Sequence, residues 1–187
     1  MAETIFDQGA DEDIMAVLAN KDARVAYQDK LMADYPDSTI LATKLNIPGP
    51  IKNNDHLEQL FAAGVRQLHA LFPTGTVTVQ PEWHKPTGPE AFWVVELPVN
   101  AAKQRAIQFE DQYALGRLFD VDALTLATKE KPLSRQDLGY PARRCLICGR
   151  PAKECARSRR HSVAELQAEI SRRYFTYFNQ DMAHAGK

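Results

Sequence analysis

The residues best suited to metal chemistry are two aspartates one residue apart, Asp120 and Asp122, in the apolar stretch 115–124. Side chains alternate across a strand, so both aspartates would share one face, about 7 Å apart. Mg²⁺ prefers carboxylate oxygens, and phosphoryl-transfer sites hold it with one or two carboxylates plus substrate phosphates. We therefore predict a Mg²⁺ and phosphate site here. The alternative is a solvated DxD pair without function, which is common in loops.

Glycines and basic residues stand where they could meet the phosphates. Gly116 and Arg117 directly precede the acidic pair, and a guanidinium can bind a phosphate through two hydrogen bonds. Upstream, PGPIK at 48–52 places Gly49 and Lys52 after an expected strand, a pattern typical of a phosphate cradle and equally of a strand-to-helix turn. We count Arg117 with the aspartates as catalytic, and the others as substrate-binding.

Three cysteines and a histidine form a second cluster, with the spacing C-x₂-C-x₆-C-x₅-H. Its members are Cys145, Cys148, Cys155 and His161. Zinc takes four thiolate or imidazole ligands in a tetrahedron, so one interpretation is a structural zinc site. The alternatives are free thiols that serve as small hydrophobic residues, or a reactive cysteine. The odd, clustered cysteines argue against a disulfide framework.

The charge is segregated although the net charge is only −1. The first 13 residues carry five acidic residues and no basic one, whereas residues 143–173 carry nine Lys or Arg against three Glu. A basic segment on a nearly neutral protein favours a polyanionic substrate or an acidic partner over general nucleic-acid binding. A solvated helix face rich in arginine would give the same pattern over 157–173.

Length and composition fit one domain over 1–187, with 44% hydrophobic and 25% charged residues. We expect no membrane segment, because no window approaches 18 consecutive apolar residues. The acidic first 15 residues lack the basic and apolar regions of a signal peptide, so the expected location is the cytoplasm.

Apolar periodicity predicts an α+β protein, with a central mixed or antiparallel sheet and helices packed on it. The C-terminal part is a Cys- and Arg-rich knuckle at 143–161 and a helix at 162–180, with a capping box in Ser162 and Glu165. A strand-borne DxD suggests a nucleotidyltransferase-like fold by analogy. The expected helices are 11–34, 54–71 and 101–112. A break is possible near Asn20 in the first, and Asn100 is expected to cap the third. The expected strands are 39–47, 76–80, 91–97 and 115–124, and 81–90, with Trp83, His84 and Lys85, is expected to be an exposed loop.

Taken together, four segments make a more specific pattern: PGPIK at 48–52, LGRLFDVDAL at 115–124, LSRQD at 133–137 and PARRCLICGRPAKECAR at 141–157. In order and spacing they resemble the apo-citrate lyase phosphoribosyl-dephospho-CoA transferases. The resemblance covers about residues 40–161. Ala123 departs from it, since a β-branched residue is expected there; this affects packing more than chemistry.

The resemblance implies transfer of 2′-(5″-triphosphoribosyl)-3′-dephospho-CoA to a serine of the citrate lyase acyl carrier protein, with release of pyrophosphate. Asp120 and Asp122 would hold Mg²⁺ against the triphosphate, and Arg117, Lys52 and Arg135 would contact phosphate oxygens. Three further arginines would contact either the dephospho-CoA moiety or the acidic carrier protein: Arg143, Arg144 and Arg157. Glu110 and Asp137 both remain candidates for the general base, and Glu110 also for a third metal-binding carboxylate.

Two other functions fit the same residues. The equivalent transferase for malonate decarboxylase would share the DxD chemistry and differ in its carrier protein. A zinc-bound interaction or nucleic-acid module would use the cysteine cluster instead. The C-terminal aromatic residues fall at helical spacing, which indicates core rather than a nucleic-acid surface, so we expect no nucleic-acid partner.

Overall fold

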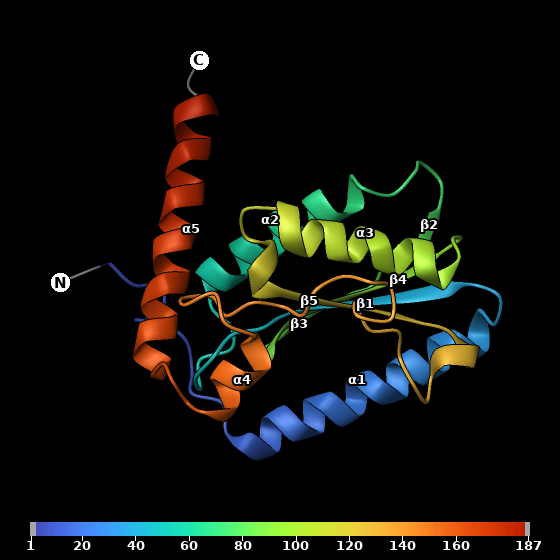
Figure 1. The fold of residues 1–187 in the computed structure, drawn as a ribbon, viewed down its shortest axis with the longest axis horizontal. Coiled ribbons are helices and arrows are strands. Elements are labelled where there is room, and N and C mark those ends of the chain that lie inside the picture. The colour runs from blue at the N-terminus through green and yellow to red at the C-terminus, as the bar shows by residue number, and fades with distance from the viewer. Residues whose placement is uncertain (1–2, 186–187) are drawn as a thin grey trace.

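An antiparallel sheet forms the centre of the protein (Figure 1). The computed structural model describes residues 3–185, with side chains through residue 180. Within that range the sheet has five strands in the order β2-β4-β1-β5, and β3 also pairs with β4. The strands are β1 (Thr39–Leu45), β2 (Val77–Val79), β3 (Glu82–Lys85), β4 (Gly88–Val95) and β5 (Phe119–Leu124). The predicted α+β class is confirmed, and of the two sheet types expected the antiparallel one is found.

Helices cover both faces of the sheet. Figure 1 shows α2 and α3 on one side and α1 on the other, with α5 standing across one end. Their bounds are α1 (Ile14–Asp34), α2 (Asp55–His69), α3 (Val99–Gln112), α4 (Ala152–Arg157) and α5 (Val163–Ala185), with single 3₁₀ turns at Gly116–Leu118 and Leu126–Thr128. The predicted capping box is present, since Ser162 Oγ accepts from the amide of Glu165 and the Glu165 carboxylate accepts from that of Ser162. None of the described helices is long and apolar enough to cross a membrane.

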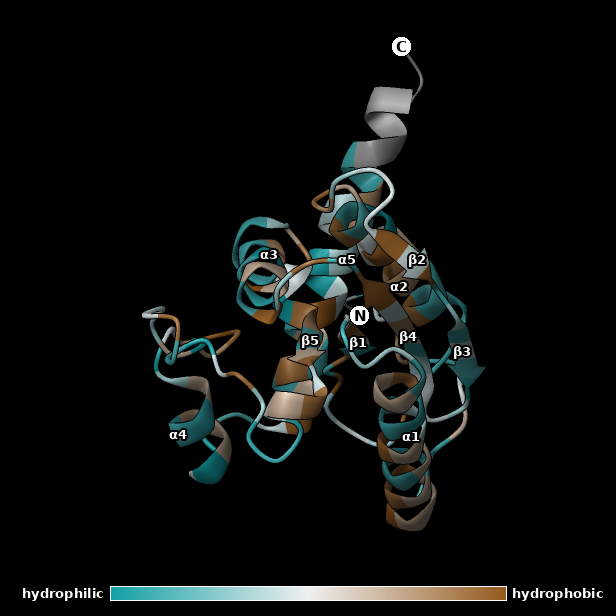
Figure 2. Cartoon of the chain, turned by 90° about the vertical axis from the view of Figure 1, so that its right-hand side faces the viewer, coloured by the Kyte–Doolittle hydropathy of each residue, from teal (hydrophilic) through white to brown (hydrophobic). Residues whose placement is uncertain are grey.

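The two faces of the sheet bury separate hydrophobic cores. The larger lies under α2, α3 and α5 and includes Leu41, Trp93 and Phe119. The smaller lies under α1 and includes Ile40, Phe92 and other apolar residues. Figure 2 shows hydrophobic colour on β4 and β5, whereas β3 and α4 are mostly hydrophilic.

Strand β5 has the alternation that the sequence predicts. Phe119, Val121 and Ala123 are buried in the larger core, whereas Asp120 and Asp122 are half-exposed on the opposite face. The ring of Phe119 lies so close to α2 that a Cβ on Gly64 would be 2.0 Å from its Cζ atom. Only glycine fits at that contact, which fixes β5 against the helix layer.

Three local predictions are wrong. Residues 81–90 are not an exposed loop, because β3 and the start of β4 form a hairpin there, and the Trp83 ring lies 4.7 Å from that of Phe92. Residues 115–118 form a turn before β5 rather than part of the strand. Helix α3 begins one residue before Asn100, after Pro98, so Asn100 is not its cap. Helix α1 is continuous through Asn20, which confirms the prediction of one helix there.

Candidate functional site

The two aspartates share a cation from the neighbouring strand. Lys44 on β1 stands opposite Asp120 in the strand register. Its Nζ donates a hydrogen bond to Asp120 Oδ2 and lies 3.8 Å from Asp122 Oδ2. The carboxylates therefore converge on one positive charge. Sequence reasoning missed Lys44, since the alternation of 39–47 gives its face but not which residue of another strand it meets.

Side chains from α3 bind the free edge of β5. Lys103 Nζ donates to the carbonyl oxygen of Val121 at 2.7 Å, and the amide of Val121 donates to Glu110 Oε1 at 3.1 Å. Lys103 Nζ also lies 3.9 Å from Asp122 Oδ1. Both edge groups of Val121 are thus paired within the protein, as buried backbone groups require. Glu110, a candidate third metal ligand or base, thus holds the edge of β5 through Oε1.

Arg143 joins the loop after β5 to the acidic pair. Its Nη1 donates to Asp120 Oδ1 at 3.2 Å, and its Nε lies 3.6 Å from Glu110 Oε2. Partial burial acts to raise the pKa of Asp120, but Lys44 and Arg143 outweigh burial and hold the pKa of that carboxyl below its ordinary value. Asp120 is therefore an anion at neutral pH, ready to bind a cation.

This donor set fits a divalent cation. Asp120 and Asp122 offer hard oxygen ligands from one rigid strand, and both already approach the same ammonium. Hard oxygen donors of this kind suit Mg²⁺ or Mn²⁺. A metal ion at these oxygens has to displace Lys44, whose long side chain can then turn elsewhere.

A cationic pocket of about 220 Å³ lies on the Lys44 side of the sheet, between β1, β4 and α1. Its positive residues are Lys21, Arg24, Lys44 and Lys52. Lys52 was a predicted phosphate contact; its Nζ donates to the carbonyl oxygen of Ile47 at 2.7 Å, and burial lowers its pKa. The pocket also contains Glu90, which stands opposite Lys44 in the β1–β4 register and accepts from Arg24 at 2.8 Å. The net charge of the lining is positive, which suits a polyphosphate.

Packing accounts for both predicted glycines. Gly49 has φ +88°, and a Cβ there would lie 2.6 Å from Gln167 Nε2 and 2.9 Å from Val163 Cγ1 on α5. A Cβ on Gly116 would lie 2.2 Å from the carbonyl oxygen of Phe109 on α3. Each glycine allows a close approach within the protein, so neither needs a phosphate to explain it.

The remaining predicted residues lie along the chain after β5. Arg117 donates a hydrogen bond to the carbonyl oxygen of Arg144. The Nη1 atom of Arg144 in turn donates to the carbonyl oxygen of Gly149 at 2.9 Å. Arg135 is bound through Nη2 to both oxygens of Asp111 at 2.7 Å. The other two are exposed: Arg157 on α4, and Asp137, which accepts from Ser134 Oγ at 2.7 Å.

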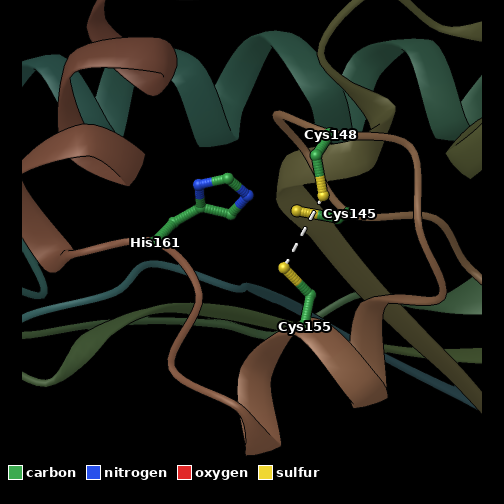
Figure 3. Close-up of side chains that lie close together, drawn as sticks. All are labelled: Cys145, Cys148, Cys155 and His161. Atoms are coloured by element: carbon green, nitrogen blue, oxygen red, sulfur yellow. Dashed lines mark hydrogen bonds between the residues drawn. The ribbon is translucent and has the colours of Figure 1, made fainter.

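The cysteine cluster comes together as predicted. One ligand atom from each of Cys145, Cys148, Cys155 and His161 lies within 4.8 Å of all the others (Figure 3). The Sγ atoms of Cys148 and Cys155 are 3.8 Å apart, about the separation of two thiolates on tetrahedral zinc with Zn–S bonds of about 2.3 Å. The cluster can therefore hold a metal ion such as zinc.

Comparison with known proteins identifies the family. Residues 12–177 match the profile of the apo-citrate lyase phosphoribosyl-dephospho-CoA transferases. The chain belongs to this family. A protein of that family from Streptococcus pyogenes, named as a probable transferase, is 32% identical over 182 residues, 97% of this chain and 95% of its own.

Two other relatives agree with this assignment. The family's named transferase from Citrobacter koseri is 35% identical over 155 residues, 82% of this chain and 83% of its own. Protein CitXG of Leuconostoc mesenteroides is 36% identical over 168 residues, 89% of this chain. The chain covers only 36% of that longer relative.

Glu110 gives a pH-dependent prediction about stability. Burial raises the pKa of Glu110 above its ordinary value of 4.5, although Arg143 and Lys103 act against burial. A raised pKa means that the folded protein binds this proton more tightly than the unfolded chain does. The stabilisation is therefore full below pH 4.5 and is lost as the pH rises through the raised pKa.

Urea unfolding of the wild type and Glu110→Gln between pH 4.5 and 8 measures this effect. We expect the free energy of unfolding of the wild type to fall with pH relative to that of the variant, because the other ionisable groups cancel in the difference. Parallel curves for the two proteins would contradict a raised pKa.

Proposed function

We propose that this chain transfers 2′-(5″-triphosphoribosyl)-3′-dephospho-CoA to a serine of the citrate lyase acyl carrier protein. The serine oxygen forms a bond to the α-phosphorus of the triphosphate, the α–β phosphoanhydride bond breaks, pyrophosphate leaves, and the serine proton is released to solvent. The observation that carries the proposal is the convergence of Asp120, Asp122 and Lys44 beside a pocket of positive residues. The names of the relatives favour citrate lyase over malonate decarboxylase as the origin of the carrier.

Different residues of the chain would hold the metal ion and bind the phosphates. Asp120 and Asp122 would hold Mg²⁺, which when bound supplies charge neutralisation for the triphosphate. Lys44, Lys52 and the other cations of the pocket bind phosphate oxygens and orient the α-phosphorus. The reaction needs mainly such orientation, which is why a strand-borne site of nucleotidyltransferase type suits it.

The acidic carrier protein would dock beside α4. Arg144 and Arg157 are exposed there, and exposed arginines attract an acidic partner over a distance of about 8 Å at physiological salt. Arg143 has a different part, because its guanidinium is already paired with Asp120 and Glu110. It would keep the loop after β5 closed over the acidic pair.

Substitution of either aspartate tests the reaction. With apo carrier protein, Mg²⁺ and the triphosphoribosyl donor, the wild type should raise the carrier mass by the donor minus pyrophosphate. We expect Asp120→Asn and Asp122→Asn each to lower kcat by about 10²–10³-fold with a smaller change in KM, because the charge they neutralise is greatest in the transition state.

Asp34→Asn is the matched control, since Asp34 is exposed at the end of α1 and pairs with Lys30. It should load the carrier at the wild-type rate. The proposal fails if the wild type adds no mass to the citrate lyase carrier, or if the aspartate variants load it as fast as the control does.

We also propose that the Cys₃His cluster binds zinc as a structural ion. Its ligands come from the loop after β5, from α4 and from the residue before the cap of α5. A bound ion would tie these segments together, in a part of the chain with few strands or long helices of its own.

Metal analysis of the purified protein tests the zinc proposal. We expect about one zinc per chain in protein purified without chelators. Cys155→Ser should lose the ion and unfold at a lower temperature, whereas Ser158→Ala, at the exposed end of α4, should keep it. Wild-type protein without zinc, or with zinc unaffected by Cys155→Ser, would overturn the proposal.

A further inference from the structure

A second pocket lies between the cysteine cluster and α5. Its volume is about 530 Å³, more than twice that of the cationic pocket. Most of its surface is apolar, from the side chains of Leu118, Leu146, Ala156, Val163, Leu166 and Ile170. A concave apolar surface of this size is typical of a site for an organic ligand.

Two arginines give this apolar pocket an anion-binding side. Arg117 lines it, and the Nη1 atom of Arg117 is buried without a hydrogen-bond partner among the described residues. A buried guanidinium nitrogen left unpaired is costly, which favours an anionic partner for Arg117 on the pocket side. Arg159 also lines the pocket and has φ +45°, the left-handed region that favours glycine.

The apolar pocket and the cationic pocket are neighbours. Asn46, which follows β1, lines both. Its amide donates to the carbonyl oxygen of Leu118 at 2.7 Å, so it stands at the junction of β1 with the turn that leads into β5. Arg117 precedes Asp120 by three residues on that turn. A long ligand could therefore cross Asn46, with a polyphosphate on one side and an apolar, anionic portion on the other.

We propose that the apolar pocket binds the adenosine diphosphate portion of the dephospho-CoA donor, with the base on the apolar wall and the diphosphate at Arg117 and Arg159. A nucleoside diphosphate has the same combination of a flat apolar surface and adjoining anions as the pocket. A purely apolar ligand would leave Arg117 Nη1 unpaired. The identity of the donor rests on the proposed function, whereas the pocket and its chemistry do not.

Binding of two fragments tests this inference without any transfer reaction. The probes are 3′-dephospho-CoA, which lacks the triphosphoribosyl group, and inorganic tripolyphosphate, each titrated calorimetrically into the full chain. Ala156→Trp fills the mouth of the apolar pocket from an exposed position on α4. Ala168→Trp, exposed on α5 outside this pocket, is its matched control.

We expect Ala156→Trp and Arg159→Gly to weaken 3′-dephospho-CoA binding at least tenfold and to leave tripolyphosphate binding within twofold. Glycine suits the backbone of position 159, so this variant should fold. Arg172→Ala, which removes an exposed arginine of α5, should bind both probes like the wild type. Conversely, Lys21→Ala in the cationic pocket should weaken tripolyphosphate alone.

Unchanged 3′-dephospho-CoA binding in both pocket variants would overturn the inference, as would an equal loss in Ala168→Trp. Carrier loading does not enter this readout. A chain that binds the fragment as predicted but loads no carrier would contradict the proposed function and leave the pocket assignment standing.

Discussion

The pairing of β5 with β1 is the constraint on which the site depends. In the β1–β5 register Thr43 stands opposite Val121, so Lys44 stands opposite Asp120. The backbone carbonyl and amide of Val121 then face away from β1, where Lys103 and Glu110 bind them. A shift by one residue would send the aspartates into the larger core and bring apolar side chains to the charged face. The same hydrogen bonds that hold the edge strand therefore also fix the direction of both carboxylates.

Charge balance follows from that register. Two carboxylates on one strand repel each other unless a cation lies between them, and Lys44 supplies that cation in this structure. A divalent ion at the same oxygens competes with the ammonium. The released ammonium of Lys44 would then lie at the cationic pocket, where it could bind an oxygen of the polyphosphate.

The sequence allowed the local features of the site to be predicted, because they depend on short-range periodicity. The shared face of Asp120 and Asp122 and the cysteine cluster are of this kind. Lys44 was missed because register between strands is not visible in one sequence. The hairpin at 81–90 was missed because its strand, EWHK, is charged and aromatic, and the packing of Trp83 that stabilises it comes from α1 and β4.

Mn²⁺ binding to the wild type and Lys44→Gln, followed by electron paramagnetic resonance, tests the central claim most directly, since Mn²⁺ shares the carboxylate preference of Mg²⁺. If Asp120, Asp122 and Lys44 form one cation site, removing the ammonium should tighten Mn²⁺ binding severalfold, the range of a partly exposed ion pair. Adding Asp120→Asn to Lys44→Gln should then abolish the gain. Mn²⁺ binding that is unchanged or weaker in Lys44→Gln would contradict the account.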